Sequence, residues 1–380
     1  MDSYVRTGDS LAAAVAALRR EPVVAVDTEA ASFHRYRDRI YLIQCSAGGR
    51  TVLIDPLALA DLSPLAALLA DPHVEKVFHD ADYDLRVLDR DYGFRAVRLF
   101  DTRISAQLAG EQAVGLAALL EKYLGVRLSK THQKADWSQR PLPAEMLAYA
   151  TADTEHLPAL RDALRARLIQ LGRLAWAEEE FTKLEALRWR GGGGGGGGAP
   201  DPEAAYLRVK GAKTLAPRQL AAFRELHRWR ETVAAREDKA PFRIIGNDAL
   251  LAVSRTLPTT TGALATVQGL PASLARRHGA ALLESVCRAL ALDEAQLPQA
   301  ERPGRPPKGR ALEERVERLK AARNRVAAGV GLDPGVLCGR TTLEAVARAH
   351  PNDRAGLAQV SELRRWQIEV LGDALLEALG

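Results

Sequence analysis

The chain has 380 residues, of which 47% are hydrophobic and 27% are charged, and its formal net charge is +5. This length exceeds one ordinary domain, and the composition is typical of a globular protein, so we expect two or three domains. Runs of about 18 apolar residues, which a membrane span requires, are missing from the sequence. Three scattered cysteines give neither a disulfide framework nor a CxxC zinc site, which favours a cytoplasmic protein.

The N-terminal stretch "MDSYVRTGDSLAAAVAALRR" places its basic pair after the apolar residues. A secretory signal has the opposite order, so this stretch is not expected to be one. We expect an alanine-rich helix instead, with Asp9 or Ser10 as its N-cap.

Short strand-like segments alternate with helical ones through the first 190 residues. The expected strands are 23–27, 40–46, 51–56, 74–79 and 98–102. The expected helices are 61–71, 83–93, 104–110, 115–125 and 144–172. The second and third strands flank "AGGR", which predicts a hairpin. A hairpin followed by alternating strands and helices indicates an α/β domain with a mixed sheet flanked by helices.

Eight consecutive glycines, Gly191 to Gly198, mark a domain boundary, because such a run forms neither helix nor strand. We expect an α/β domain at 1–190, a flexible linker at 191–211, a helical domain at 212–297, a Pro/Arg-rich linker at 298–311 and a second helical domain at 312–380. Residues 1–190 hold 25 basic and 27 acidic residues, and residues 191–380 hold 28 and 21, so the basic excess lies in the helical half. Such an excess suits a polyanion, although solvated arginine-rich helices also produce it.

Two carboxylates, Asp27 and Glu29, stand at the exit of the apolar strand "VVAVDTEA". Residues two apart in a strand face the same side, so both acids would point at one spot. Buried charge needs compensation. Either the strand ends in a solvated turn at Asp27, or a metal binds there.

Further acids lie at other strand and helix ends. Asp80, Asp82 and Asp84 follow the strand at 74–79, and Asp101 ends the strand at 98–102. Tyr149 and Asp153 are four apart on a helix and therefore share one face. Each has an ordinary alternative as well, because Asp80, Asp82 or Asp101 could be a helix N-cap and Asp153 an exposed helical residue.

Taken together, these residues resemble the DEDD exonuclease superfamily, in which D-x-E, a later Asp and Y-x-x-x-D occur in this order. The tyrosine marks the DEDDy branch. The stretch "DWSQRPLPAEMLAYATADTEHL" resembles the ribonuclease D signature, and "DRIYLIQCS" resembles the segment after that family's first motif. Residues 215–270, which include "ELHRWRETVAAREDKAP" and "DALLAVSRTLP", look like an HRDC domain, and the last segment has the same layout. The octaglycine run departs from that family, where the junction is ordinary sequence.

The resemblance implies a ribonuclease-H-like exonuclease fold followed by two all-α HRDC-like domains, and a site with two divalent ions, Mg²⁺ or Mn²⁺. By this resemblance Asp27 would bridge both ions, Glu29 and Asp153 would complete the shell of the hydrolytic ion, and Asp84 would support the second. Tyr149 would orient the attacking water. Asp80 stays an alternative to Asp84, and Asp101 could support the site. Without metal, two carboxylates ~5 Å apart repel by roughly 3 kcal/mol at an effective dielectric constant near 20.

The expected activity is 3′-5′ exoribonucleolytic trimming of structured RNA such as tRNA precursors, with release of 5′-mononucleotides, by a monomer. The expected RNA contacts are Arg224, Arg228, Arg230, Arg236 and Lys239. Two alternatives stay open: a non-catalytic RNA-binding adaptor, and an exonuclease of the same superfamily that degrades DNA.

Overall fold

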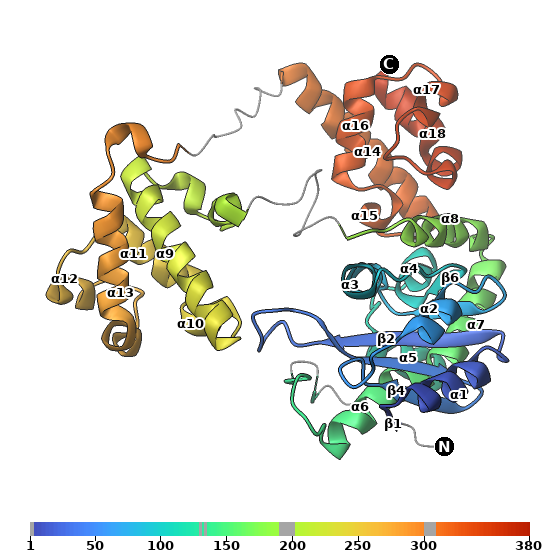
Figure 1. Cartoon of the computed structure of the whole chain (residues 1–380). Coiled ribbons are helices and arrows are strands. Elements are labelled where there is room, and N and C mark those ends of the chain that lie inside the picture. The colour runs from blue at the N-terminus through green and yellow to red at the C-terminus, as the bar shows by residue number, and fades with distance from the viewer. Residues whose placement is uncertain (1–3, 129–130, 133–134, 190–201, 300–308) are drawn as a thin grey trace. The chain divides into compact units, whose positions relative to one another are not determined.

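The computed structural model describes residues 4–128, 131–132, 135–189, 202–299 and 309–380. These residues belong to two compact units, each described by itself (Figure 1). The first unit comprises Met1–Ala30, Ile40–Trp189 and Pro307–Gly380, and the second comprises Ala31–Arg39 and Arg190–Pro306. The glycine run 191–198 lies outside the described residues, as does most of the predicted linker at 298–311. The flexible linker was predicted too long, because residues 202–208 of the predicted range 191–211 form a 3-10 helix whose Tyr206 is buried in the core of the second unit.

A six-stranded mixed sheet lies at the centre of the first unit, in the order β1-β4-β3-β2-β5-β6. Its strands are β1 (Tyr4–Val5), β2 (Val23–Ala30), β3 (Ile40–Ala47), β4 (Arg50–Ile54), β5 (Glu75–Phe78) and β6 (Leu99–Asp101). β2 is antiparallel to β3 and parallel to β5, so the predicted mixed sheet is confirmed. The sequence analysis missed β1, because two residues are too few to leave a strand pattern.

The predicted hairpin joins β3 to β4. Its two turn residues, Gly48 and Gly49, have φ angles of 55° and 73°. Two consecutive positive φ angles are the signature of the tight turn whose twist matches the flanking strands, and glycine adopts them without strain. The hairpin fixes the register of β3 and thereby the residue that lies opposite each position of β2.

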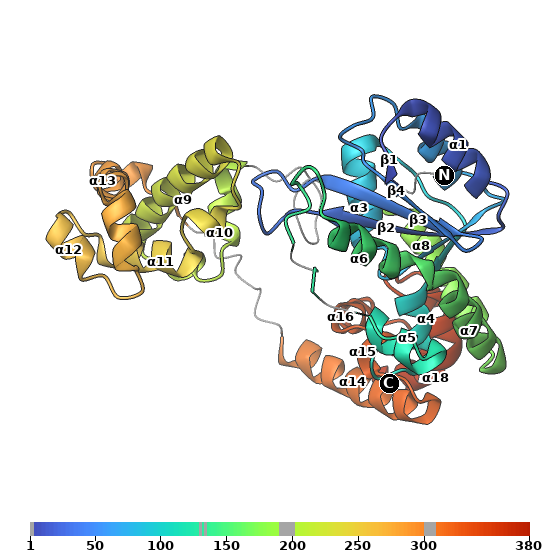
Figure 2. The ribbon, with the colours of Figure 1, turned by 90° about the horizontal axis from the view of Figure 1, so that it is seen from below.

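Helices cover the sheet. They are α1 (Gly8–Leu18), α2 (Ser63–Leu69), α3 (Asp82–Tyr92), α4 (Thr102–Leu108), α5 (Leu116–Leu124), α6 (Ala144–Glu155), α7 (Leu157–Gln170) and α8 (Leu174–Glu185). Figure 2 shows α1 and α6 on opposite sides of the sheet, and α6 packs on β2, β3 and β4. This packing places one face of α6 over the strand that carries Asp27 and Glu29.

Two helix boundaries differ from the prediction. The N-cap of α1 is Thr7, whose hydroxyl accepts a hydrogen bond from the Ser10 backbone at 3.3 Å, so the prediction of Asp9 or Ser10 was wrong. The helix predicted over 144–172 is two helices that meet at His156, with Pro158 in the first turn of the second. Proline fits a first turn because it has no N–H to donate there.

The C-terminal helices join the sheet and its helices in one unit. They are α14 (Arg310–Val330), α15 (Pro334–Leu337), α16 (Arg340–Ala349), α17 (Arg354–Ala358) and α18 (Arg365–Leu379). The rings of Trp176 in α8 and Trp366 in α18 stack with centroids 5.0 Å apart. The sequence analysis did not identify α8, which contacts α18 through this ring pair.

Acidic residues of α8 hold the start of α18. The Glu179 carboxylate accepts the backbone N–H groups of Arg365 and Trp366 at 2.8 and 3.1 Å. Glu180 accepts a hydrogen bond from the Trp366 indole at 2.9 Å and pairs with Arg364 at 3.1 Å. A carboxylate at a helix N-terminus satisfies free donors and complements the helix dipole. The contact between α8 and α18 therefore combines stacked indole rings with specific hydrogen bonds.

The second unit is helical. Its elements are η1 (Pro202–Arg208), η2 (Ala212–Thr214), α9 (Pro217–Glu237), α10 (Pro241–Ile244), α11 (Asn247–Thr256), α12 (Thr261–Ala265), α13 (Ala272–Leu290) and η3 (Glu294–Gln296). The segment 31–39, which leaves β2, packs on these helices: the Ala240 backbone donates to the His34 carbonyl at 3.2 Å, and Arg243 donates to the Phe33 carbonyl at 2.6 Å. Within the described ranges, none of the helices is both long enough and apolar enough to cross a membrane.

We predict that Trp366→Ala lowers the stability of the first unit by about 3–5 kcal/mol, because the indole is 3% exposed and loses both its stacking partner and its hydrogen bond. Urea unfolding monitored by circular dichroism measures the change. The control is Trp189→Ala, which removes an indole that is 37% exposed. Equal losses in the two variants would contradict a docking role for Trp366.

Candidate active site

The first two acids lie on β2. Asp27 is opposite Gln44 of β3 and Glu29 is opposite Leu42, and the pairing becomes irregular directly after Glu29. Both acids are half-buried and, being two apart, face the same side of the sheet. The strand therefore does not end at Asp27, and the first of the two alternatives for this stretch is wrong.

α6 brings the third acid. Oxygens of Asp27, Glu29 and Asp153 all lie within 4.8 Å of one another. Next to Asp153, the buried Thr154 hydroxyl bonds the Ser46 hydroxyl of β3 at 2.7 Å, which fixes the helix over the sheet. Tyr149 lies one turn earlier on the same helix face, and the charge of Asp153 acts on its hydroxyl. Three predicted acids and the tyrosine thus meet at one place.

Asp84 lies in the first turn of α3 and is 6% exposed. It accepts a hydrogen bond from the Thr28 hydroxyl at 2.5 Å, and its charge acts on Asp27. It is not one of the three acids within 4.8 Å of one another. Asp84 therefore borders the cluster, on the side of Asp27.

The other candidate acids have structural partners. Asp80 has a positive φ angle of 68° and an exposed side chain that pairs with Arg103 at 2.8 Å. Asp101 is the N-cap of α4 and accepts the backbone N–H groups of Ile104 and Ala81 at 2.9 and 2.7 Å. Asp101 therefore binds the starts of α3 and α4. This confirms the alternative prediction that Asp101 is a helix N-cap. Neither Asp80 nor Asp82 is the N-cap of α3, which is Ala81.

Burial dominates the electrostatics of the cluster. It raises the pKa of Asp27 and Glu29 well above the usual range, and the neighbouring carboxylates raise it further. Burial also raises the pKa of Asp84 to about 7 and that of Asp153 to about 6. Burial and the charge of Asp153 raise the pKa of Tyr149. Ionised together, these groups need a cation.

The donor set fits a divalent metal. Mg²⁺ and Mn²⁺ prefer hard oxygen ligands, and carboxylates from separate strands and helices can surround such an ion. Asp27, Glu29 and Asp153 present these oxygens at one point, and Asp84 adds a fourth carboxylate beside Asp27. Binding of a cation would offset the repulsion and the burial that raise the pKa values.

Residues of the "DWSQRPL" stretch surround and support the site. The sequence analysis used this stretch as a family signature and assigned no role to its residues. Trp137 is 1% exposed, with its ring 6.2 Å from that of Tyr149. Arg140 donates to both oxygens of the buried Asp55, at 2.8 and 2.9 Å, and to the Tyr41 carbonyl at 2.7 Å. These contacts tie the segment that precedes α6 to β3 and to the end of β4.

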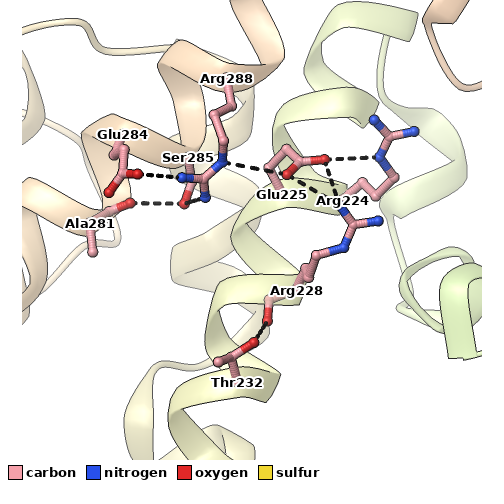
Figure 3. Close-up of polar contacts among 8 residues, drawn as sticks. All are labelled: Arg224, Glu225, Arg228, Thr232, Ala281, Glu284, Ser285 and Arg288. Carbon is pink, nitrogen blue, oxygen red and sulfur yellow. Dashed lines mark hydrogen bonds and ion pairs between the residues drawn. The ribbon is translucent and has the colours of Figure 1, made fainter.

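Two of the predicted RNA contacts belong to a group of three arginines in the second unit. Arg224, Arg228 and Arg288 approach the carboxylate of Glu225 at 3.2, 3.4 and 3.6 Å (Figure 3). Glu225 is 8% exposed, and Arg288 also pairs with Glu284 of α13 at 2.7 Å, so two carboxylates face the three guanidinium groups (Figure 3). Arg224 and Arg228 also line a cavity of about 410 Å³ together with Tyr36, Tyr206 and His227. The sequence analysis missed Arg288, which comes from α13 and carries no local signal.

The other predicted contacts differ in exposure. Arg230 is 5% exposed and donates to Asn247 at 2.6 Å and to Glu231 at 2.9 Å, so it stabilises the helical domain and is unsuited to bind phosphate. Arg236 and Lys239 are exposed and pair with Glu237 at 3.4 and 3.0 Å. We therefore remove Arg230 from the expected RNA contacts and keep the other four.

We predict that the metal-free protein loses stability as the pH rises from about 4 to 7. The pKa of Asp153 is about 6 and that of Asp84 about 7 in the folded chain, both above the unfolded value near 4. Stability linked to such groups is complete below the unfolded pKa and is lost as the pH rises through the folded pKa. Thermal unfolding in chelator measures this slope.

The variant Asp153→Asn should flatten this slope and raise the Tm of the metal-free protein at pH 7.5 by about 2–4 °C. Asp80→Asn is the control and should keep the wild-type slope, because its side chain is exposed. If Asp153→Asn kept the wild-type slope of stability against pH, the pKa of Asp153 would not be raised in the folded chain.

Comparisons with known proteins agree with this geometry. A 3′-5′ exonuclease family model matches residues 3–169, and an HRDC domain model matches residues 219–286 and 313–379. The chain is 33% identical to the ribonuclease D of Pseudomonas paraeruginosa over 378 residues, which cover 99% of this chain and 97% of that protein. It is 34% identical to the Escherichia coli ribonuclease D over 296 residues, 78% of this chain and 76% of that protein.

Solved structures give the same result. The crystal structure of E. coli RNase D, described as an exoribonuclease involved in structured RNA processing, matches with a TM-score of 0.69 and 28% identity over 99% of this chain and 98% of that one. The catalytic core of Trypanosoma brucei RRP6 matches with a TM-score of 0.64 and 30% identity over 76% of this chain and 81% of that one. The chain belongs to the ribonuclease D family of 3′-5′ exoribonucleases.

Proposed function

We propose that this chain trims the 3′ ends of structured RNA such as tRNA precursors by metal-dependent hydrolysis that releases 5′-mononucleotides. The observation that carries the proposal is the meeting of Asp27, Glu29 and Asp153 within 4.8 Å, with Tyr149 one helical turn from Asp153. Asp27, Glu29, Asp84 and Asp153 would hold two Mg²⁺ or Mn²⁺ ions. Bound there, such ions would lower the pKa of a water molecule and would neutralise negative charge on the phosphate and the leaving oxygen.

Tyr149 orients groups and does not take up a proton. Burial and the charge of Asp153 raise its pKa above the ordinary value of a phenol. A phenol that stays protonated at neutral pH can donate to a carboxylate or accept from a water, but it is a poor proton acceptor. We therefore propose that Tyr149 positions the attacking water. Trp137 packs beside its ring and limits the ring's movement.

Structured RNA is the proposed substrate because the E. coli relative with 28% identity is described as acting in structured RNA processing. The adaptor alternative is disfavoured, because a binding protein without chemistry gains nothing from a buried cluster of acids that costs stability. DNA stays the second candidate substrate, since carboxylates that hold metal ions do not distinguish the two sugars. The three free cysteines, two of them buried, favour a cytoplasmic location, and we propose a monomer.

We predict that Asp27→Ala and Asp153→Ala each lower 3′-end trimming on the order of 10³-fold, because loss of one positioned electrostatic group costs about 10²–10³ in rate. The assay follows 5′-labelled RNA and DNA with Mg²⁺, with Mn²⁺ and with chelator. Stepwise shortening of RNA alone, only with metal, is expected.

Asp80→Ala is the matched control and should act like the wild-type chain. Shortening of DNA at the same rate as RNA would favour the DNA-degrading alternative. A gel shift without shortening would favour the non-catalytic RNA-binding adaptor. Trimming at the wild-type rate by Asp27→Ala would refute the site itself.

We further propose that Arg224, Arg228 and Arg288, with Arg236 and Lys239, bind phosphates of the RNA body. Arg228 and Arg288 are about half exposed, with 51% and 45% of their side chains accessible, so their guanidinium groups can reach a phosphate from solvent. Such contacts neutralise phosphates without reading sequence, so they give salt-dependent binding. The nearby Tyr36 and Tyr206 add aromatic rings to this basic surface.

We predict that the double variant Arg228→Ala/Arg288→Ala weakens binding of a long RNA and lowers the slope of log affinity against log salt by about 2. Arg224 is kept in this variant, because the buried Glu225 needs one cation. Fluorescence anisotropy at several salt concentrations measures the effect. Arg310→Ala, which removes an exposed and paired arginine of α14, is the control. An unchanged slope in the double variant would contradict the proposed surface.

A further inference from the structure

Gln44 is a buried amide with no partner. It lies in the middle of β3, is 0% exposed, and neither its Oε1 nor its Nε2 atom has a hydrogen-bond partner among the described residues. Leaving a buried polar group unpaired costs stability, and a leucine or methionine would fill the same space without that cost. The strand segment is otherwise mostly apolar, with Ile40, Leu42 and Ile43 fully buried. The amide therefore opposes folding at a position where apolar residues suit the strand.

The position of Gln44 relates it to the site. It is directly opposite Asp27 in the antiparallel pair of β2 and β3, so both side chains rise from the same face of the sheet. Cβ atoms of such cross-strand neighbours are about 4.5–5.5 Å apart. A glutamine side chain can span this separation to a carboxylate through one water. Gln44 is thus within reach of the acid that is central to the cluster.

A neighbour on the same face shows that this environment can satisfy a polar group. Ser46, two residues further along β3, bonds Thr154 of α6 at 2.7 Å and Thr51 of β4 at 2.6 Å. The Asp27 carboxylate accepts a hydrogen bond from the Thr28 backbone. It still has lone pairs that Gln44 could contact, because an ionised carboxylate offers about four acceptor sites. An acid that holds a cation is usually held in turn by such a donor.

We infer that Gln44 is a positioning residue for Asp27, whose amide N–H, through one buried water, orients the carboxylate toward the bound cation. The inference rests on the proposed function, because it gives Asp27 a role in holding the metal. The amide does not touch the substrate, and its contribution is to reduce the number of orientations that the carboxylate adopts. The buried amide lowers the stability of the fold at this position, but it fixes the orientation of the Asp27 carboxylate.

The test uses the full-length variant Gln44→Met, which keeps the length of the side chain and removes its donor and acceptor. The Tm in chelator, the dissociation constant of Mn²⁺ from calorimetry, and kcat/KM on 5′-labelled RNA are measured. The Tm should not fall, since the amide has no hydrogen-bond partner among the described side chains and backbone groups. The affinity for Mn²⁺ should fall about 10–100-fold, which is typical when the partner of a metal ligand is lost. The value of kcat/KM at subsaturating metal should fall with it.

Ser254→Ala is the control. It removes a buried hydroxyl that donates to the Leu250 carbonyl at 2.7 Å, so it should lower stability while the Mn²⁺ affinity stays within about twofold of the wild-type value, since Ser254 lies outside the unit that carries the acids. A lower Tm in Gln44→Met would show that the amide is an ordinary structural group and would overturn the inference. So would an unchanged affinity for Mn²⁺. Asp27→Ala separates the two hypotheses: if it still trims RNA, the proposed function fails, whereas an inactive Asp27→Ala beside a fully active Gln44→Met refutes only the role of Gln44.

Discussion

Electrostatic repulsion among buried acids is the constraint on which the structure depends. Asp27, Glu29 and Asp153 lie together in a setting where burial already disfavours their charges, and Asp84 adds a further carboxylate beside Asp27. The fold has to hold these groups together against that repulsion. It does so with contacts that are neutral or fully paired: the register of β2 against β3, the Ser46–Thr154 bond under α6, and the Arg140–Asp55 pair. The site is thus a strained arrangement that a divalent cation would relax.

Much of this arrangement could be predicted from the sequence, because its causes are local. An apolar strand that ends in D-x-E places two acids on one face, and Y-x-x-x-D places its members one helical turn apart. The choice between Asp80 and Asp84 could not be made in this way, since both follow the same strand. The structure shows Asp80 with a left-handed backbone and a partner in Arg103, and Asp84 buried under Thr28. A backbone angle and a distant arginine decide this point, and neither leaves a pattern in the sequence.

The features that the sequence analysis missed all depend on contacts between distant segments. Trp176 of α8 stacks on Trp366, almost two hundred residues further along the chain, and Arg288 reaches Glu225 only because α13 packs on α9. The burial of Arg230 follows from Asn247 in α11. Hydrophobic periodicity describes one helix at a time, so it predicts the helices of both HRDC-like domains but not which of their arginines remain at the surface.

The interleaved connectivity of the two units has a consequence for the intact chain. Residues 31–39, which belong to the N-terminal part of the chain, pack on helices that follow the glycine run, and α18 near the C-terminus docks on α8, which precedes it. A protease that cut the backbone within the run of glycines would leave two fragments that interlock at both of these contacts. The nicked protein would migrate as two bands under denaturing conditions while retaining the hydrodynamic size of the uncut chain. The association of the segments on either side therefore depends little on which residues occupy positions 191–198. A run of one residue type at this junction agrees with that.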